Sequence, residues 1–131
     1  MKPKKAKKNK PIVHTKFPFT PEDREVLSNA LDFLMNYDGF SFTDAKIEHS
    51  CAFEAANKLD GDDCTLTRGE VRAAAKAVEV ALHALSDANT DFSYIESGFP
   101  GLVADLKENI PTLERLNELL QAVVKDLRKM K

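Results

Sequence analysis

The sequence predicts an all-α fold: a compact bundle of about five helices with an alanine-rich helix at its centre, preceded by a disordered basic arm. Apolar residues recur at intervals of three and four along most of the 131 residues, which is the spacing of one helix face. The segment 68–86 is apolar around most of its circumference, so other helices must cover it on most sides. The first ten residues, in contrast, contain six lysines and no acidic residue.

Charge and composition divide the chain into an arm and one domain. The first ten residues carry +6, whereas the remaining 121 residues carry 13 basic and 21 acidic side chains, which leaves the body at −8. Because residues 1–16 have no hydrophobic period to offset the entropy of ordering them, we expect a flexible lysine-rich arm there. Residues 17–131 are expected to form a single helical domain, with Phe17 and Phe19 marking where the chain docks onto it.

The first two helices are predicted from capping residues and apolar spacing. Thr20 is suited to cap a helix and Pro21 to its first position, and this helix should end near Tyr37, before an Asp-Gly pair. A second helix is expected after Thr43, and it should end in the acidic turn at residues 60–63. Its apolar stripe contains Ile47, Cys51, Ala55 and Leu59.

The third helix is the predicted centre of the bundle. Thr67 and Glu70 have the spacing of a capping box, so the helix should run from about Arg68 to Ser86. Its many alanines permit neighbouring helices to approach closely. One polar stripe is left to face water: Arg72, Lys76, Glu79 and His83.

The remainder of the chain predicts two more helices. Residues 86–101 form a long connection with one short helical turn around residues 92–96, and Pro100 opens a fourth helix that Pro111 interrupts. The last helix should run from about Thr112 to Met130. We expect its heptad seam to be buried in the bundle, although pairing with a second copy is an alternative. The seam contains Leu113, Leu116, Leu120, Val123, Leu127 and Met130.

Most of the aromatic residues lie in predicted connections rather than in helices. One interpretation is that they pin the loops to the core, and the other is that they form an exposed protein-binding patch. The short aromatic alternations at residues 38–42 and 91–94 are also candidates for a small β-bridge. The candidate protein-binding residues are Phe40, Phe42, Phe92, Tyr94 and Phe99.

The lysines of the arm are candidates for contacting phosphates. Six cations on a flexible segment release counterions when they neutralise a polyanion, which predicts weak, salt-sensitive binding without sequence preference. Against this, the acidic body repels the same polyanion, and no predicted helix has an Arg/Lys face that fits a groove of DNA. The candidate residues are Lys2, Lys4, Lys5, Lys7, Lys8 and Lys10.

Two candidate metal sites fail on spacing. The acidic turn at 60–70 resembles a calcium loop in its closing Glu70, but two early carboxylates fall at the wrong positions and Cys64 replaces the required glycine. A zinc site would have to combine His49 and Cys51 with Cys64 and His83. On a helix, however, His49 and Cys51 are about 200° apart around the axis, so they cannot both reach one zinc ion. We therefore expect no metal and no cofactor.

A catalytic site is also not predicted. His83 and Glu79 are one turn apart and are the best general-base pair in the sequence, but no nucleophile or glycine-rich motif accompanies them. We expect a protein without enzymatic activity.

The leading functional prediction is a protein–protein interaction module, and the alternative is an accessory nucleic-acid-associated protein that contacts phosphates through the arm.

No run of apolar residues is long enough to span a membrane, and residues 12–19 are too polar for the core of a secretory signal. The two cysteines, Cys51 and Cys64, are expected to be reduced. A cytoplasmic monomer is therefore expected, with a homodimer through the last helix as the alternative.

Overall fold

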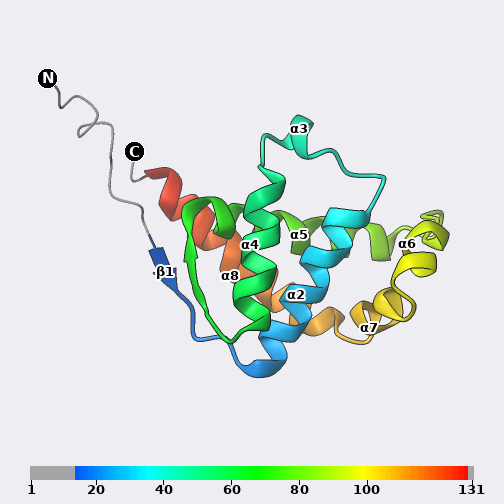
Figure 1. Ribbon diagram of the computed structural model, residues 1–131, viewed down its shortest axis with the longest axis horizontal. Helices are drawn as coiled ribbons and strands as arrows, with labels where there is room; N and C mark the ends of the chain where they lie inside the picture. Colours follow the sequence, from blue (N-terminus) through cyan, green and yellow to red (C-terminus); the bar gives the residue numbers. More distant parts are fainter. Residues whose placement is uncertain (1–13, 130–131) are drawn as a thin grey trace, which may run out of the picture.

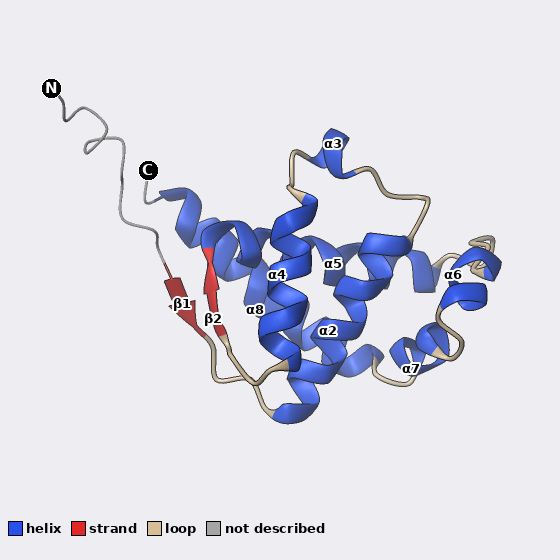
Figure 2. Cartoon of the chain, viewed as in Figure 1, coloured by secondary structure: helices blue, strands red, loops and turns tan. Residues whose placement is uncertain are grey.

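The computed structural model describes residues 14–129, and its all-α architecture confirms the predicted fold class (Figures 1 and 2). Four long helices form the body, and three short helices and two three-residue strands lie between or beside them. In chain order the elements are β1 His14–Lys16, α2 Pro21–Asn36, α3 Phe42–Ala45, α4 His49–Asp60, β2 Thr65–Thr67, α5 Arg68–Ser86, α6 Ser93–Gly98, α7 Leu102–Lys107 and α8 Ile110–Lys129. None of the helices in this range combines the length and apolar character needed to cross a bilayer.

Helix α5 lies at the centre of the bundle, as predicted. It packs against α2, α4 and α8, and Figure 1 shows α2 and α4 in front of α5 and α8. The small alanine side chains let these neighbours approach its backbone closely. Its buried apolar residues are Val71, Ala73, Ala74, Ala75, Ala77, Val78, Ala81 and Ala84.

The structure corrects the predicted boundary between the arm and the domain. Residues 14–16 form strand β1, which pairs antiparallel with β2, so that His14 lies opposite Thr67 (Figure 2). The backbone N–H of Phe17 donates to the carbonyl of Cys64 at 3.0 Å. Phe17 and Phe19 are buried with their rings stacked 4.8 Å apart, which anchors the strand. The strand was not predicted because its partner is about fifty residues away in the sequence.

The capping box predicted at the start of α5 is present and is extended by an ion pair. The Thr67 hydroxyl accepts from the backbone N–H of Glu70 at 3.2 Å, and the Glu70 carboxylate accepts from the N–H of Thr67 at 2.9 Å. The same carboxylate lies 2.7 Å from the Lys58 ammonium, which also donates to the carbonyl of Thr65. One buried carboxylate thus connects α4, β2 and α5.

The start of α2 is also capped as predicted, and a distant helix reinforces the cap. Thr20 and Asp23 form a capping box, and Arg115 of α8 pairs with the buried carboxylate of Asp23. Burial by itself would raise the pKa of Asp23, but hydrogen bonds from Arg115 and Thr20 outweigh it and hold the pKa below its usual value. The carboxylate therefore stays charged at neutral pH and ties α8 to α2.

The predicted second helix is divided in two, which is a correction. The backbone of Lys46 is left-handed, with φ of 59°, and the N–H of Ile47 donates to the carbonyl of Phe42 at 3.1 Å. These features close α3 after one turn. Ile47 is then buried, and α4 begins at His49. Apolar spacing could not show this break, because Ile47 lies in phase with the stripe of α4.

The boundary between the last two helices also differs from the prediction. Helix α7 ends at Lys107, and Ile110 belongs to α8, where Pro111 is in the first turn and its missing N–H removes no helical hydrogen bond. The predicted seam is buried at Leu113, Leu116, Leu120 and Leu127, but Val124 is more fully buried than Val123. Because α8 packs against both α5 and α2, its buried face is broader than a two-helix seam. Met130 lies outside the described residues.

The carboxylate of Asp32 gives a pH-dependent prediction for the α2–α4 interface. Burial, and secondarily the negative charge of Asp60, raise the pKa of Asp32. The carboxylate of Asp60 accepts from the buried Ser28 hydroxyl at 2.7 Å, which holds it in place on the neighbouring helix. An acid whose pKa is raised by folding destabilises the protein above that pKa, and the penalty disappears below its unfolded pKa of about 3.9.

Asp32→Asn should therefore raise the free energy of unfolding at pH 7, and the gain over wild type should shrink as the pH falls toward about 3.9. Urea unfolding across this pH range measures the difference. Asp38→Asn, which removes an exposed carboxylate, controls for net charge. A gain that does not depend on pH would contradict the electrostatic cause.

Candidate functional site

An open groove of about 500 Å³ lies between the C-terminal end of α2 and the second half of α5. Its apolar walls come from one aromatic pair and from two small side chains of α5, and its rim is polar and includes two acidic residues. We call it the aromatic groove. Its lining residues are Tyr37, Gly39, Phe40, Glu79, Val80, His83, Ala84, Asp87 and Thr90.

The end of α2 builds one wall of the aromatic groove. The helix stops at Asn36, and the ring of Tyr37 stacks on the buried ring of Phe33 with centroids 4.8 Å apart. A Cβ atom on Gly39 would lie 2.6 Å from the outer end of the Tyr37 ring, so a larger residue at this position would force the ring to move. The Asp-Gly pair that predicted the helix end therefore also shapes the groove.

A row of rings continues from the groove toward α4. Phe40 contacts Phe42 edge to face, with centroids 4.9 Å apart, and Phe42 contacts the His49 ring at 5.1 Å. Both phenylalanines are half-buried and pack against the hydrophobic core. They hold the connection between α2 and α4 and leave part of each ring at the surface.

The second group of predicted aromatics surrounds α6. Phe92 is half-buried, lies 6.1 Å from Phe33 between ring centroids, and has the Lys107 ammonium 5.8 Å from its own centroid. Tyr94 and Phe99 are 67% and 39% exposed. Both line a smaller hollow of about 150 Å³ that also includes Asn36.

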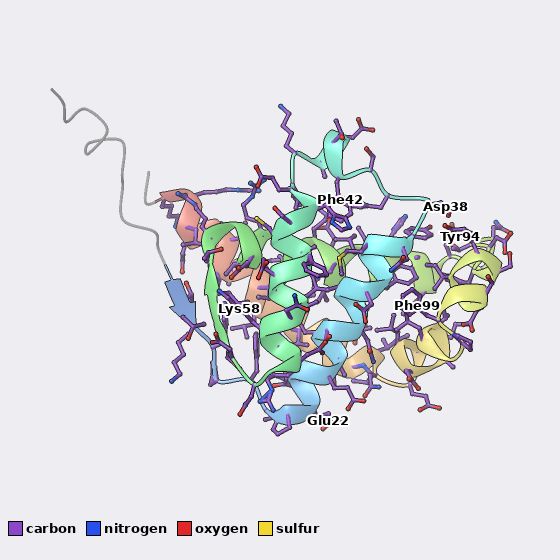
Figure 3. All side chains as sticks on the ribbon, viewed as in Figure 1. Glu22, Asp38, Phe42, Lys58, Tyr94 and Phe99 are labelled. Carbon is purple, nitrogen blue, oxygen red and sulfur yellow. The ribbon has the colours of Figure 1, made fainter. Side chains whose placement is uncertain are left out.

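The five candidate aromatics are thus divided between two places and two roles. Figure 3 shows Tyr94 and Phe99 at the α6 end of the molecule, whereas Phe42 lies by the upper end of α4. The side chains of Phe40, Phe42 and Phe92 pack against the core and attach the interhelical connections to it. The rings of Tyr94 and Phe99 are exposed to solvent. The β-bridge considered between 38–42 and 91–94 is not formed, since the one sheet of the described residues joins β1 to β2.

Two aromatic residues contribute to the surface without having been predicted from the sequence. Phe53 on α4 is 51% exposed, and its position between Cys51 and Ala55 places it opposite the apolar stripe, which is a signal that could have identified it. Tyr37 was assigned only as the end of a helix. Its role in the groove depends on Phe33 and Gly39, which the sequence does not relate to it.

The predicted polar stripe of α5 faces outward, but its Glu79 does not orient His83. The carboxylate of Glu79 lies 3.4 Å from the Lys76 ammonium and accepts from the Gln121 side chain at 3.5 Å. His83 is exposed on the rim of the aromatic groove. General-base chemistry would need Glu79 to pair with His83, but Glu79 instead contacts Lys76 and Gln121 at the surface.

The acidic turn is occupied by structural contacts. Asp62 pairs with Arg24 at 2.8 Å, and the carboxylate of Asp63 accepts from the backbone N–H of Thr65 at 2.9 Å. Asp60 and Glu70 bind Ser28 and Lys58, as described above. Within residues 14–129, no three side chains of the types that ligate metals are grouped to hold an ion.

The two cysteines are free thiols in different settings. Cys51 is half-buried against Gly69, and burial, together with the charges of Glu48 and Glu70, raises the pKa of its thiol. A raised pKa leaves less of the reactive thiolate at neutral pH. Cys64 lies before β2 and accepts from Phe17 through its carbonyl.

The remaining candidates are the six lysines of the arm, which lie outside the described residues: Lys2, Lys4, Lys5, Lys7, Lys8 and Lys10. In the described range, the aromatic groove and the exposed rings of α6 are therefore the site that the geometry favours. Comparisons of the chain with models of known protein families, with curated proteins and with solved structures found no match.

Proposed function

We propose that the chain is a non-catalytic protein-binding module and that the aromatic groove is its principal binding surface. The groove supports this because it offers half-buried apolar side chains from two elements, Tyr37 and Phe40 on one wall and Val80 on the other. Aromatic side chains in partly desolvated hollows supply much of the binding energy at protein interfaces. The exposed rings of Tyr94 and Phe99 line a second hollow with Asn36, the residue before Tyr37, and we include them in the proposed surface.

The rim of the groove defines the chemistry of the partner. Glu79 and Asp87 line it, and Asp38 is exposed beside Gly39. Acidic groups at a rim favour partners of complementary charge and increase the rate of encounter. The proposed partner is a protein segment that inserts an apolar side chain and carries a basic residue next to it.

Three observations support the remaining parts of the proposal. Glu79 contacts Lys76 and Gln121 rather than His83, which favours binding over acid–base catalysis. The apolar face of α8 is covered by α5 and α2, which favours a monomer. Free thiols at Cys51 and Cys64 are compatible with the reducing cytoplasm, where we propose that the protein acts.

The test compares two aromatic substitutions. Phe40→Ala removes a ring from the groove, and Phe53→Ala removes an exposed ring from α4, outside it. Immobilised wild type and both variants are used to capture partners from a lysate of the native host, and each captured protein is then purified and titrated calorimetrically. A partner of the groove should bind Phe40→Ala at least about 30-fold more weakly than wild type and should bind Phe53→Ala unchanged.

A second variant separates binding from stability. Thr90→Arg places a cation on the rim, where it should repel a basic partner, and leaves the apolar walls in place. Thermal unfolding verifies that each variant is folded at the assay temperature. The proposal is wrong if the titrated partners bind all three variants like wild type, or if Phe53→Ala weakens binding as much as Phe40→Ala.

A further inference from the structure

The chain contains two Asp-Gly pairs, and the structure places them in different settings. Asp38-Gly39 lies in the turn after α2, and Figure 3 shows Asp38 on the connection that leads to α3. Asp60-Gly61 lies at the end of α4, with Gly61 as its C-cap. All four residues are exposed. The two pairs therefore match in sequence and in access to solvent, and they differ in their local contacts.

The contacts at Asp60-Gly61 hold both the amide and the carboxylate of that pair. The backbone N–H of Gly61 donates to the carbonyls of Asn57 and Lys58, each at 3.1 Å. The Asp60 carboxylate accepts from the buried Ser28 hydroxyl at 2.7 Å. Either group can move only when hydrogen bonds at the end of the helix are broken.

The contacts at Asp38-Gly39 are fewer. Within residues 14–129, the N–H of Gly39 donates no hydrogen bond, and the carboxylate of Asp38 forms neither a hydrogen bond nor an ion pair. The turn is closed by one long bond, in which the N–H of Phe40 donates to the carbonyl of Tyr37 at 3.3 Å. The amide and the carboxyl group of this pair are therefore not held apart by other partners.

We propose that Asp38 is a site of spontaneous isomerisation to isoaspartate in the folded protein, and that Asp60 is protected from the same reaction. The amide nitrogen of Gly39 bonds to the side-chain carbonyl carbon of Asp38 in its neutral acid form, and the amide proton leaves with the carboxyl OH as water. Hydrolysis of the cyclic imide at its main-chain carbonyl then gives isoaspartate. One water is lost and one is gained, so the composition of the chain does not change. Glycine favours the ring closure because it has no Cβ to obstruct its own amide.

Isomerisation would change the wall of the aromatic groove that this turn builds. The main chain of isoaspartate runs through the former side chain, which lengthens the backbone between Tyr37 and Gly39 by one methylene group. Both residues line the groove, and Gly39 lies against the outer end of the Tyr37 ring. The longer backbone cannot keep this contact unchanged. The effect on the geometry of the groove is the same whether or not a protein partner binds there.

The second Asp-Gly pair provides an internal control. Folded protein, and protein unfolded in guanidinium chloride, are incubated at neutral pH, and isoaspartate at each pair is quantified by peptide mapping with electron-transfer fragmentation. In the folded protein, isoaspartate should form at Asp38 at least about tenfold faster than at Asp60, because a difference of about 1.4 kcal/mol in the free energy needed to release the amide is sufficient. In the unfolded chain the two rates should be similar, because the hydrogen bonds of Gly61 are absent.

A charge-preserving variant identifies the reacting residue. Asp38→Glu keeps the carboxylate but would have to close a larger ring, so its segment should not form the isomer. The isoaspartyl form of the wild type is separated by ion exchange and compared with unmodified protein by NMR. The aromatic signals of Tyr37 should shift, whereas those of Phe53, exposed on α4, should not.

Three results would overturn the proposed modification. These are equal rates at the two pairs in the folded protein, no isoaspartate at Asp38 over a period in which the unfolded chain forms it, and an unchanged rate in the Asp38→Glu variant. Unshifted Tyr37 signals would contradict the effect on the groove. None of these measurements requires a binding partner, so their outcome is independent of the Phe40→Ala test of the proposed function.

Discussion

Phe33→Ala should lower the free energy of unfolding by about 3–5 kcal/mol, which is the largest effect we expect from one substitution. The ring is fully buried on α2 and lies 4.8 Å from the Tyr37 ring and 6.1 Å from the Phe92 ring, between centroids. Its loss removes apolar burial and two aromatic contacts, and it leaves a cavity that the surrounding helices can fill only in part. Urea unfolding at neutral pH measures the change.

The same substitution should also loosen the aromatic groove. Tyr37 lines the groove and rests on Phe33, so its ring should become mobile when this support is removed. Phe53→Ala is the control, because it removes an exposed phenylalanine and should change stability by less than about 0.5 kcal/mol. A similar loss in both variants would show that Phe33 does not contribute to the core as described.

Leu120→Ala should lower the free energy of unfolding by about 2–5 kcal/mol and leave the protein monomeric. Leu120 is fully buried in the face of α8 that packs against α5 and α2. A side chain buried within one chain contributes to that chain's own stability, whereas one buried between copies contributes to association. Denaturant unfolding and sedimentation at several concentrations together distinguish these cases.

Glu118→Ala, two residues away on the exposed side of α8, should have little effect on either measurement. If the wild type sediments as a dimer, and if Leu120→Ala dissociates it while its fold is retained, then α8 is an interface between copies. That result would also overturn the proposed monomer.

The candidate sites were predictable only in part. The location of Phe40 in a connection identified one wall of the aromatic groove, but the opposite wall comes from Val80 and Ala84, which had been assigned to a largely buried helix face. Phe92 and Tyr94 are two residues apart in the same connection, yet one packs toward Phe33 and the other is 67% exposed. Composition and spacing do not distinguish them, because only the tertiary packing brings Phe92 against Phe33 of α2.

The hollow of about 140 Å³ that Arg72 and Arg128 line between α5 and α8 was not predictable at all. Along the sequence, Arg72 lies in a stripe that includes Glu79, and Arg128 lies 56 residues later, near the end of another helix. Each residue alone is typical of a solvated helix surface. Only the packing of α8 against α5 places the two guanidinium groups on one hollow.

The sequence by itself determined the features that depend on local physics. Capping boxes at Thr20 and Thr67 begin α2 and α5 where they were predicted, because a side chain and a backbone N–H three residues apart suffice to form them. Apolar residues surround most of the circumference of α5. This predicted its central position, since such a helix must be covered on most sides.

The tertiary structure alone decided the features that join distant residues. These are the pairing of His14 with Thr67, the ion pair of Arg115 with Asp23, and the choice of which loop aromatics remain exposed. In each case the free energy comes from a contact between elements whose relative position no local pattern contains. The division of the predicted second helix has the same cause in part, because Ile47 is buried against the core at the break between α3 and α4.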